Sequence, residues 1–312
     1  MIVTLTPNPS IDRTIELSEP LERGGVIRSV SSHDDAGGKG VNVAQVVRNA
    51  GQLAVAVIPG DHDDPLLTRL RELRVTHRAV PTGVPSRINL TLAEFDGITT
   101  KVNAPGTRLT ADQLGQLIRE LAREAAGARW AVLSGSLPPG VDSGWYADVV
   151  ESIADVGLRI AVDTSGESLR KTLDRVADRI DLIKPNSDEL AELLDVPAAS
   201  FEGDPQLAYD TAKPLLDRGV KEILLTLGSA GALLLGGDGM WSAAAPPIIA
   251  RSTVGAGDSA LAGYLIGALE GAEPGQRLGL AVAYGSAAAS LPGSTMPGPG
   301  DLPDLPEVIR LR

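Results

Sequence analysis

Residues 130–163 read WAVLSGSLPPGVDSGWYADVVESIADVGLRIAVD. Two short apolar runs in this segment, Trp130–Leu133 and Arg159–Asp163, predict strands, and Trp145–Asp155 between them has helical spacing. A strand, a helix and a second strand in this order form the unit from which parallel sheets are built. The segment therefore predicts an α/β fold.

The same alternation continues along the rest of the chain. Strands are predicted at residues 2–5, 53–58, 181–184, 222–226 and 232–235, and helices at residues 40–50, 66–73, 109–127, 188–194, 207–218, 258–269 and 278–290. Thr110 is the predicted N-cap of its helix. Repeated strand–helix order predicts a three-layer αβα fold, in which helices cover both faces of a mostly parallel central sheet. We expect residues 1–312 to form a single domain.

Two segments, at about residues 12–33 and 86–104, interrupt this alternation. The first holds strand-like pieces at 14–17 and 26–30 with no helix between them. The second alternates apolar and polar residues around Asp96-Gly97, a pair typical of hairpin turns. We expect both to pair into a small antiparallel sheet outside the main one and to act as a lid. The alternative is an extension at the edge of the main sheet.

The charge balance limits the classes of partner. The 312 residues include 28 Lys and Arg against 40 Asp and Glu, a formal net charge of −12. Binding of nucleic acid needs a net cationic face, so we expect no nucleic-acid partner, although a small anion in a local positive pocket is compatible. The chain has no Cys, and its three His (His33, His62 and His77) are scattered. Neither a thiolate site nor a His-rich metal site is expected.

No membrane segment is expected either. The longest uncharged stretch, residues 278–300, is interrupted by Ser, Gly and Pro. The apolar N-terminal run is too short for a signal peptide and has no basic leader. These features predict a cytoplasmic protein.

The strongest local motif is Thr253-Val-Gly-Ala-Gly-Asp-Ser259, directly before an Ala- and Leu-rich helix. Glycines at a helix start let backbone N–H groups converge on an anion, and the helix dipole adds positive potential. Asp258 could cap this helix. Alternatively, its carboxylate could accept a proton from a substrate hydroxyl that attacks a phosphorus atom.

Three further stretches carry polar groups at predicted strand ends or helix starts. Asn186 and Glu189 follow Lys184-Pro185 and could reach a hydrated Mg²⁺, or could simply cap a helix. Gly37-Gly-Lys-Gly40 is a glycine-rich helix start with one cation, but it is not a Walker A loop. Asp12, after the first strand, lies where such sheets bind ligands, or is an ordinary turn residue in solvent.

Seven short segments, taken together and in this order, are specific evidence for one protein family, although each segment alone is weak evidence. They read TPNPSID (6–12), GGKGVNVA (37–44), SRIN (86–89), SGSLPPG (134–140), KPNSDEL (184–190), TLGSAGAL (226–233) and STVGAGDS (252–259). Over essentially its whole length the chain resembles the PfkB branch of the ribokinase-like carbohydrate kinases. Within that branch it is most similar to members that act as 1-phosphofructokinase or tagatose-6-phosphate kinase.

The resemblance implies a ribokinase-like fold with a β-sheet lid, and ATP and Mg²⁺ as cofactors. It implies that Asp258 is the catalytic base and that Gly255, Ala256 and Gly257 form the anion hole. The implied substrate-binding residues are Asp12, Gly37, Gly38, Lys39, Asn42, Arg87 and Ser136, with Lys39, Arg87 and Ser136 around the phosphate of the sugar. The implied nucleotide-binding residues are Lys184, Asn186, Thr226, Gly228, Ser229, Gly231 and Ser286. Asn186 and Glu189 would hold Mg²⁺ through water.

The implied activity is ATP-dependent phosphorylation of a ketose monophosphate, first fructose 1-phosphate to fructose 1,6-bisphosphate. Tagatose 6-phosphate and fructose 6-phosphate are the alternatives. Members that use fructose 6-phosphate usually have a Lys near Val26 and lack Lys39, which favours the first two substrates. Lys101 and Ala104 stand where relatives have Glu, so no role is assigned to them. A non-catalytic regulator that binds sugar phosphates is the alternative of a different class. Since relatives pair through the lid, we expect a homodimer.

Overall fold

The main sheet of the computed structural model, which describes residues 1–197, 201 and 203–312, has ten strands within those residues. Their order is β14-β13-β12-β11-β10-β9-β8-β1-β4-β5. Their bounds are β1 Ile2–Leu5, β4 Ala54–Pro59, β5 Thr76–Val80, β8 Trp130–Ser134, β9 Arg159–Asp163, β10 Leu182–Ile183, β11 Glu222–Thr226, β12 Ala232–Gly236, β13 Gly239–Ala243 and β14 Val308–Arg310. Neighbouring strands from β5 to β11 pair in parallel, and those from β11 to β14 pair antiparallel. The prediction of a mostly parallel sheet is confirmed.

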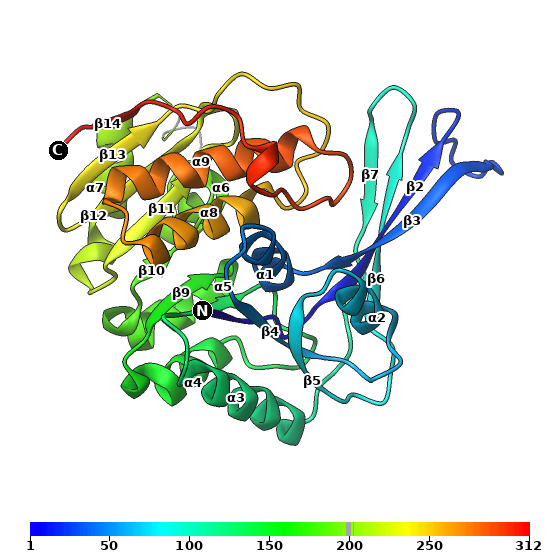
Figure 1. Ribbon diagram of the computed structural model, residues 1–312, viewed down its shortest axis with the longest axis horizontal. Coiled ribbons are helices and arrows are strands. Elements are labelled where there is room, and N and C mark those ends of the chain that lie inside the picture. Colours follow the sequence, from blue (N-terminus) through cyan, green and yellow to red (C-terminus); the bar gives the residue numbers. More distant parts are fainter. Residues whose placement is uncertain (198–200, 202) are drawn as a thin grey trace.

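Helices cover both faces of this sheet, because successive strand residues point to opposite sides. Ile2 packs into one core and Val3 into the other. The first core is covered by α1 (Lys39–Asn49), α2 (Pro65–Glu72), α8 (Ala256–Glu270) and α9 (Pro274–Ser290). The second is covered by α3 (Ala111–Ala125), α4 (Trp145–Ile153), α5 (Gly166–Val176), α6 (Ser187–Leu194) and α7 (Pro205–Asp217). These layers confirm the three-layer prediction (Figure 1).

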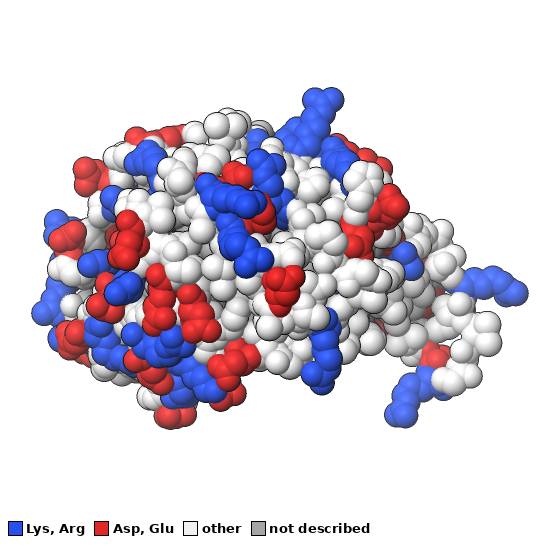
Figure 2. All heavy atoms as spheres, turned by 90° about the horizontal axis from the view of Figure 1, so that it is seen from below, with Lys and Arg blue, Asp and Glu red and all other residues white. Residues whose placement is uncertain are grey.

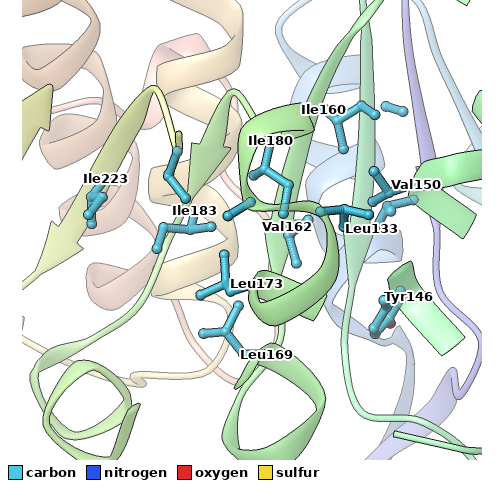
Figure 3. Packing of buried hydrophobic residues seen from close by; sticks show 14 of the residues in the cluster. Leu133, Tyr146, Val150, Ile160, Val162, Leu169, Leu173, Ile180, Ile183 and Ile223 are labelled. Atoms are coloured by element: carbon cyan, nitrogen blue, oxygen red, sulfur yellow. The ribbon is translucent and has the colours of Figure 1, made fainter. Parts of the chain in front are cut away.

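Figure 3 shows part of the second core, where side chains of the sheet meet those of α4 and α5. Leu133 and Val162 come from neighbouring strands, and Tyr146 and Leu173 come from the two helices packed against them. All four are at most 1% exposed. Burying one such side chain contributes about 1.5–3 kcal/mol relative to leaving it in water, so these cores fix the strand ends that carry the site.

Four elements were missed by the sequence analysis: α5, β5, β13 and β14. Helix α5 has a narrow apolar stripe among charged residues, with Leu169, Leu173 and Val176 buried. The other three lie at or near the edges of the main sheet, where one side of a strand is open and the apolar pattern is weak. The N-cap prediction for α3 is confirmed: Thr110 accepts a hydrogen bond from the N–H of Gln113 in a capping box.

A separate four-stranded sheet projects from the main body, in the order β3-β2-β6-β7 (Figure 1). Its strands are β2 Ser10–Leu17, β3 Ser29–Gly37, β6 Arg87–Ala93 and β7 Thr99–Val102, so it is not an extension of the main sheet. The strands run beyond the predicted limit of 12–33 at both ends, and β3 begins after Val26.

The prediction of a wholly antiparallel small sheet is wrong, because β2 and β6 pair in parallel, with Asp12 opposite Asn89. The reason lies in the connections. β2 follows β1 and β6 follows β5, and these two main-sheet strands run in the same direction. Both chains therefore leave the same edge of the main sheet and enter the small sheet side by side.

The surface agrees with the charge balance of the sequence. In Figure 2, acidic and basic side chains are interspersed over the visible face of the main body, and the projecting part at the right carries blue and red side chains among white ones. Among the described residues, no helix is long and apolar enough to cross a membrane.

Candidate active site

A cleft of about 300 Å³ lies where the small sheet meets the carboxyl ends of the main-sheet strands. Of the predicted site residues, it is lined by Asp12, Gly38, Lys39, Asn42, Arg87, Ser136, Glu189, Gly255 and Asp258. Eight residues that were not predicted also line it: Thr6, Asn8, Ser10, Asn89, Gly135, Thr164, Ser165 and Val254. The volume falls at the lower end of the range for small-molecule sites.

The carboxylate of Asp258 is buried at the start of α8 and is 8% exposed. Its Oδ2 accepts a hydrogen bond of 2.8 Å from Nδ2 of Asn42 on α1. The N-cap position belongs to Gly255, at φ 74°, so the interpretation of Asp258 as a helix cap is wrong. Burial, followed by the negative charge of Asp163, raises the pKa of Asp258 to about 6, although Lys39, Asn42 and Lys184 oppose the rise. A carboxylate with this pKa is ionised at neutral pH and still accepts a proton readily.

The glycine loop before α8 is tightly surrounded. A Cβ on Gly255 would lie 2.4 Å from the Cε of Met296, and one on Gly257 would lie 3.3 Å from Nζ of Lys184. The first N–H groups of a helix have no partner within it, so the first turn of α8 offers donors to an anion. The ammonium of Lys184 lies directly behind this loop.

Asp163, at the end of β9, was missed as a site residue. Its carboxylate is fully buried, and its Oδ1 lies 2.9 Å from Nζ of Lys39 and 3.4 Å from Nζ of Lys184. Burial works to raise the pKa of Asp163, but the two ammonium groups outweigh it and hold that pKa below its ordinary value. The one available signal was an aspartate at the carboxyl end of a predicted strand, where α/β sheets bind ligands.

Lys39 was predicted beside the phosphate of the sugar, but its amino group has other partners. Besides Asp163, it lies 3.5 Å from Oε1 of Glu189. Burial works to lower the pKa of Lys39, but the charges of Asp163, Glu189 and Asp258 raise it above the ordinary value. The ammonium therefore stays charged and belongs to the carboxylate cluster around Asp258.

At the small-sheet side of the cleft, polar side chains of β2 and β6 form a hydrogen-bonded cluster. Oδ1 of Asp12 accepts hydrogen bonds of 2.7 Å from Oγ of Ser10 and 3.1 Å from Nδ2 of Asn89. Gly37 faces the same carboxylate, since a Cβ there would lie 2.3 Å from Oδ2 of Asp12. Asp12 is thus a cleft residue rather than a turn residue in solvent. Asn89 was missed because its role depends on the parallel β2–β6 pairing.

Arg87 is fixed by backbone carbonyls. Its guanidinium donates to the oxygens of Ala104, Asn8 and Pro9 at 2.7, 2.9 and 3.3 Å. Burial lowers its pKa from the ordinary value, and Asp12 partly opposes this effect. A guanidinium has five N–H donors, so this arrangement holds the group rigidly and leaves donors for a ligand.

Asn186 and Glu189 form a reciprocal capping box at the start of α6. Oδ1 of Asn186 accepts from the N–H of Glu189 at 2.8 Å, and Oε2 of Glu189 accepts from the N–H of Asn186 at 2.9 Å. The capping interpretation is therefore confirmed. Glu189 also lines the cleft. Within the described residues, no three His, Asp or Glu are grouped so as to hold a metal ion directly. Oδ1 of Asn186 and Oε2 of Glu189 already accept hydrogen bonds in the capping box. This arrangement suits a Mg²⁺ ion that these residues contact through water molecules rather than directly.

The remaining predicted nucleotide residues lie behind or beside the cleft. Thr226 forms a bridge with Asn186 at the end of β11 and precedes a short 3₁₀ turn, Gly228–Ala230. Ser229 lies within this turn, and Gly231 is the first residue after the turn. Ser286 is buried on α9, next to Gly285, which packs against the first turn of α8.

Comparison with known proteins identifies the family. The sequence profile described as pfkB family carbohydrate kinase matches residues 5–299. The chain belongs to the PfkB family of carbohydrate kinases. It is therefore a phosphotransferase that acts on an alcohol group and uses ATP as a substrate.

Individual PfkB proteins resemble the chain over nearly its full length. It is 31% identical to a 1-phosphofructokinase of Borreliella burgdorferi, over 93% of this chain and 92% of that one. It is also 31% identical to the ATP-dependent 6-phosphofructokinase isozyme 2 of Escherichia coli, over 92% of each chain. The crystal structure of phosphofructokinase-2 from Escherichia coli in complex with potassium has a TM-score of 0.88 and 30% identity, and 96% of each chain is covered. The predicted ribokinase-like fold is confirmed.

Proposed function

We propose that this PfkB kinase transfers the γ-phosphoryl group of ATP to fructose 1-phosphate and forms fructose 1,6-bisphosphate. The observation that carries the proposal is the buried carboxylate of Asp258, with its pKa of about 6, at the glycine-rich start of α8. Similarity to a 1-phosphofructokinase supports the choice of sugar phosphate. Fructose 6-phosphate and tagatose 6-phosphate are the other candidates, the first because a 6-phosphofructokinase is equally similar.

In the proposed reaction, the free hydroxyl of the sugar phosphate attacks the γ-phosphorus while Asp258 accepts the hydroxyl proton. ADP leaves as the new phosphate ester forms. Backbone N–H groups of Gly255, Ala256 and Gly257 face the negative charge on the transferring group. Lys39 and Lys184 add two positive charges on the same side, and such preorganised charge is the main source of catalysis in phosphoryl transfer.

The sugar would lie between α1 and the small sheet. Asp12, Asn42 and Gly38 would bind its hydroxyls, and Gly37 lets the Asp12 carboxylate approach the backbone closely. Arg87 and Ser136 would hold its existing phosphate, since a fixed guanidinium suits a phosphate dianion. Closure of the small sheet as a lid would exclude water and so limit ATP hydrolysis.

Nucleotide and metal binding form the other half of the proposal. Thr226, Gly228, Ser229, Gly231 and Ser286 would line the ATP site. Asn186 and Glu189 would hold Mg²⁺ through water, since their oxygens suit that ion. When bound, the ion would neutralise charge on the ATP phosphates.

We also propose that the protein is a homodimer paired through the small sheet. Ser10, Asp12, Arg87 and Asn89 share the face that lines the cleft. The other face carries apolar cross-strand pairs, Ile15 with Leu92 and Leu90 with Val102, and Val102 is 55% exposed. A second copy of this sheet would cover that apolar face.

A panel of ADP-release assays tests the catalytic proposal. Fructose 1-phosphate, fructose 6-phosphate and tagatose 6-phosphate are each supplied with ATP and Mg²⁺. We expect the highest kcat/KM with fructose 1-phosphate. Preference for either other sugar would refute the substrate assignment. Binding of a sugar phosphate without any ADP release would favour the non-catalytic regulator.

A further inference from the structure

The least exposed ion-pair cluster described in the structure joins three distant parts of the chain. Asp163 ends β9, Lys39 begins α1, and Lys184 follows β10. The carboxylate of Asp163 is 0% exposed and the side chain of Lys184 is 5% exposed. Both ammonium groups approach the same oxygen, Oδ1, at 2.9 and 3.4 Å.

The backbone around Asp163 is itself fixed. Its carbonyl oxygen accepts from the N–H of Gly135 at 3.0 Å. The carbonyl of Gly135 in turn accepts from the hydroxyls of Tyr146 and Thr164, each at 3.0 Å. The backbone at Asp163 is thus anchored by the segment after β8 and by α4, without help from the lysines that its carboxylate binds.

Stability alone does not explain this carboxylate. The other oxygen of Asp163, Oδ2, is buried and has no hydrogen-bond partner among the described residues. Leaving such an atom unpaired costs about 1–3 kcal/mol, and buried ion pairs are often no more stabilising than apolar groups of the same shape. The lysines stabilise the charged carboxylate but leave Oδ2 unpaired, and what the cluster achieves is the placement of two cations.

Those two cations lie at the reacting end of the cleft. Nζ of Lys184 lies behind the glycine loop at Gly257, and the charges of Lys39 and Lys184 both act on the carboxylate of Asp258. Without an anion between them, the buried ammonium of Lys184 and the partly buried one of Lys39 would repel each other and move apart.

We propose that Asp163 is a positioning residue that holds Lys39 and Lys184 together as a two-cation clamp for the transferring phosphoryl group. This inference rests on the proposed function, because the clamp is needed only where phosphoryl transfer occurs. Asp163 touches neither substrate and acts only through the two lysines.

The test compares Asp163→Asn with wild type and with a matched control, Asp181→Asn. Asp181 accepts a 2.8 Å bond from the N–H of Ile160, so Asp181→Asn removes one carboxylate charge near the opposite end of the same strand and keeps an oxygen that can accept this bond. For Asp163→Asn we expect kcat to fall roughly tenfold to a hundredfold, the loss typical when an orienting partner is removed, with KM for the sugar phosphate nearly unchanged. Asp181→Asn should keep kcat. An equal loss of kcat in both variants would assign Asp163 a merely structural role.

A double-mutant cycle shows whether Asp163 acts through the lysines. Asp163→Asn combined with Lys39→Met should lose clearly less than the two single losses added together. Simple additivity would overturn the proposal.

ATP affinity measured by calorimetry separates this inference from the proposed function. Removing a negative charge would by itself tighten ATP binding, whereas loss of the clamp should weaken it relative to AMP. If wild type turns over no sugar phosphate but Asp163→Asn weakens ATP binding and not AMP binding, the clamp stands and the sugar assignment fails. Tighter ATP binding in that variant would overturn the clamp.

Discussion

Replacing Asp258 by Asn should make the protein more stable and far less active. Burial and the nearby charge of Asp163 raise the pKa of Asp258 from 3.8 to about 6 in the folded state. The folded chain therefore binds this proton more tightly than the unfolded chain does, so the ionised carboxylate destabilises the fold. Asn has the same shape without the charge, and its side-chain oxygen can accept the hydrogen bond from Asn42.

The size of the effect follows from the pKa values. A difference of about 2 pH units, at about 1.4 kcal/mol for each, makes ionised Asp258 cost the fold about 3 kcal/mol at pH 8. As the pH falls through 6 toward 4, wild type regains this stability because the carboxylate becomes protonated. At pH 4.5 the cost should be about 1 kcal/mol. The advantage of Asp258→Asn over wild type should therefore be largest at pH 8 and small in acid.

Urea denaturation of both proteins at pH 8 and pH 4.5 measures this advantage, and ADP release at pH 8 measures activity. We expect kcat to fall roughly 10²–10⁴-fold, the usual range for loss of a general base. The partly exposed Asp12 supplies a control variant, Asp12→Asn, which should weaken sugar binding without the gain in stability. A variant less stable than wild type at pH 8 would contradict the electrostatic reasoning. Near-normal turnover would contradict the role of Asp258 as base.

Further predictions concern the pH profile, the substrate phosphate, the dimer and α3. The kcat/KM of wild type should fall about tenfold per pH unit below pH 6, because protonated Asp258 accepts no proton; a flat profile down to pH 5 would count against this. Arg87→Lys should raise KM for the sugar phosphate more than tenfold and leave KM for ATP nearly unchanged, since an ammonium cannot replace the fixed guanidinium; equal changes would speak against the assignment. Val102→Glu should convert a dimer to a monomer in light scattering, whereas Lys101→Glu on the other face should not. Thr110→Ala should lower the free energy of unfolding by about 1 kcal/mol in urea, through loss of the capping box.

The layers of the fold could be predicted because most of their strands and helices have a recognisable spacing of apolar residues within a short stretch of sequence. The run Trp130–Leu133 is buried on both faces and has no polar residue, which is typical of a central parallel strand. Helix α5 was missed because a few apolar residues suffice to cover the sheet there, and the rest of it is charged and exposed. The parallel pairing of β2 and β6 could not be predicted from either segment alone, because it follows from where β1 and β5 end.

The glycine loop and Asp258 were predicted because their chemistry lies within one short stretch of sequence. Asp163 was missed for the opposite reason. Its role depends on Lys39, which is 124 residues away in sequence, and on Lys184 beyond the next helix. An aspartate at a strand end has no distinguishing feature until the fold brings two lysines to it.

The place of Lys39 changes the argument about the substrate. In the sequence, the presence of Lys39 and of Val26 favoured fructose 1-phosphate or tagatose 6-phosphate over fructose 6-phosphate, and Lys39 was also placed beside the phosphate of the sugar. In the structure its ammonium is bound to Asp163 and lies near Glu189, at the end of the cleft that holds Asp258. A lysine there serves any phosphoryl acceptor equally. In the proposed binding mode, discrimination between ketose phosphates would come from Arg87, Ser136 and the small sheet, at the other side of the cleft. Exchanging Lys39 should therefore lower kcat for all three ketose phosphates alike, whereas changes at Arg87 should alter their ranking.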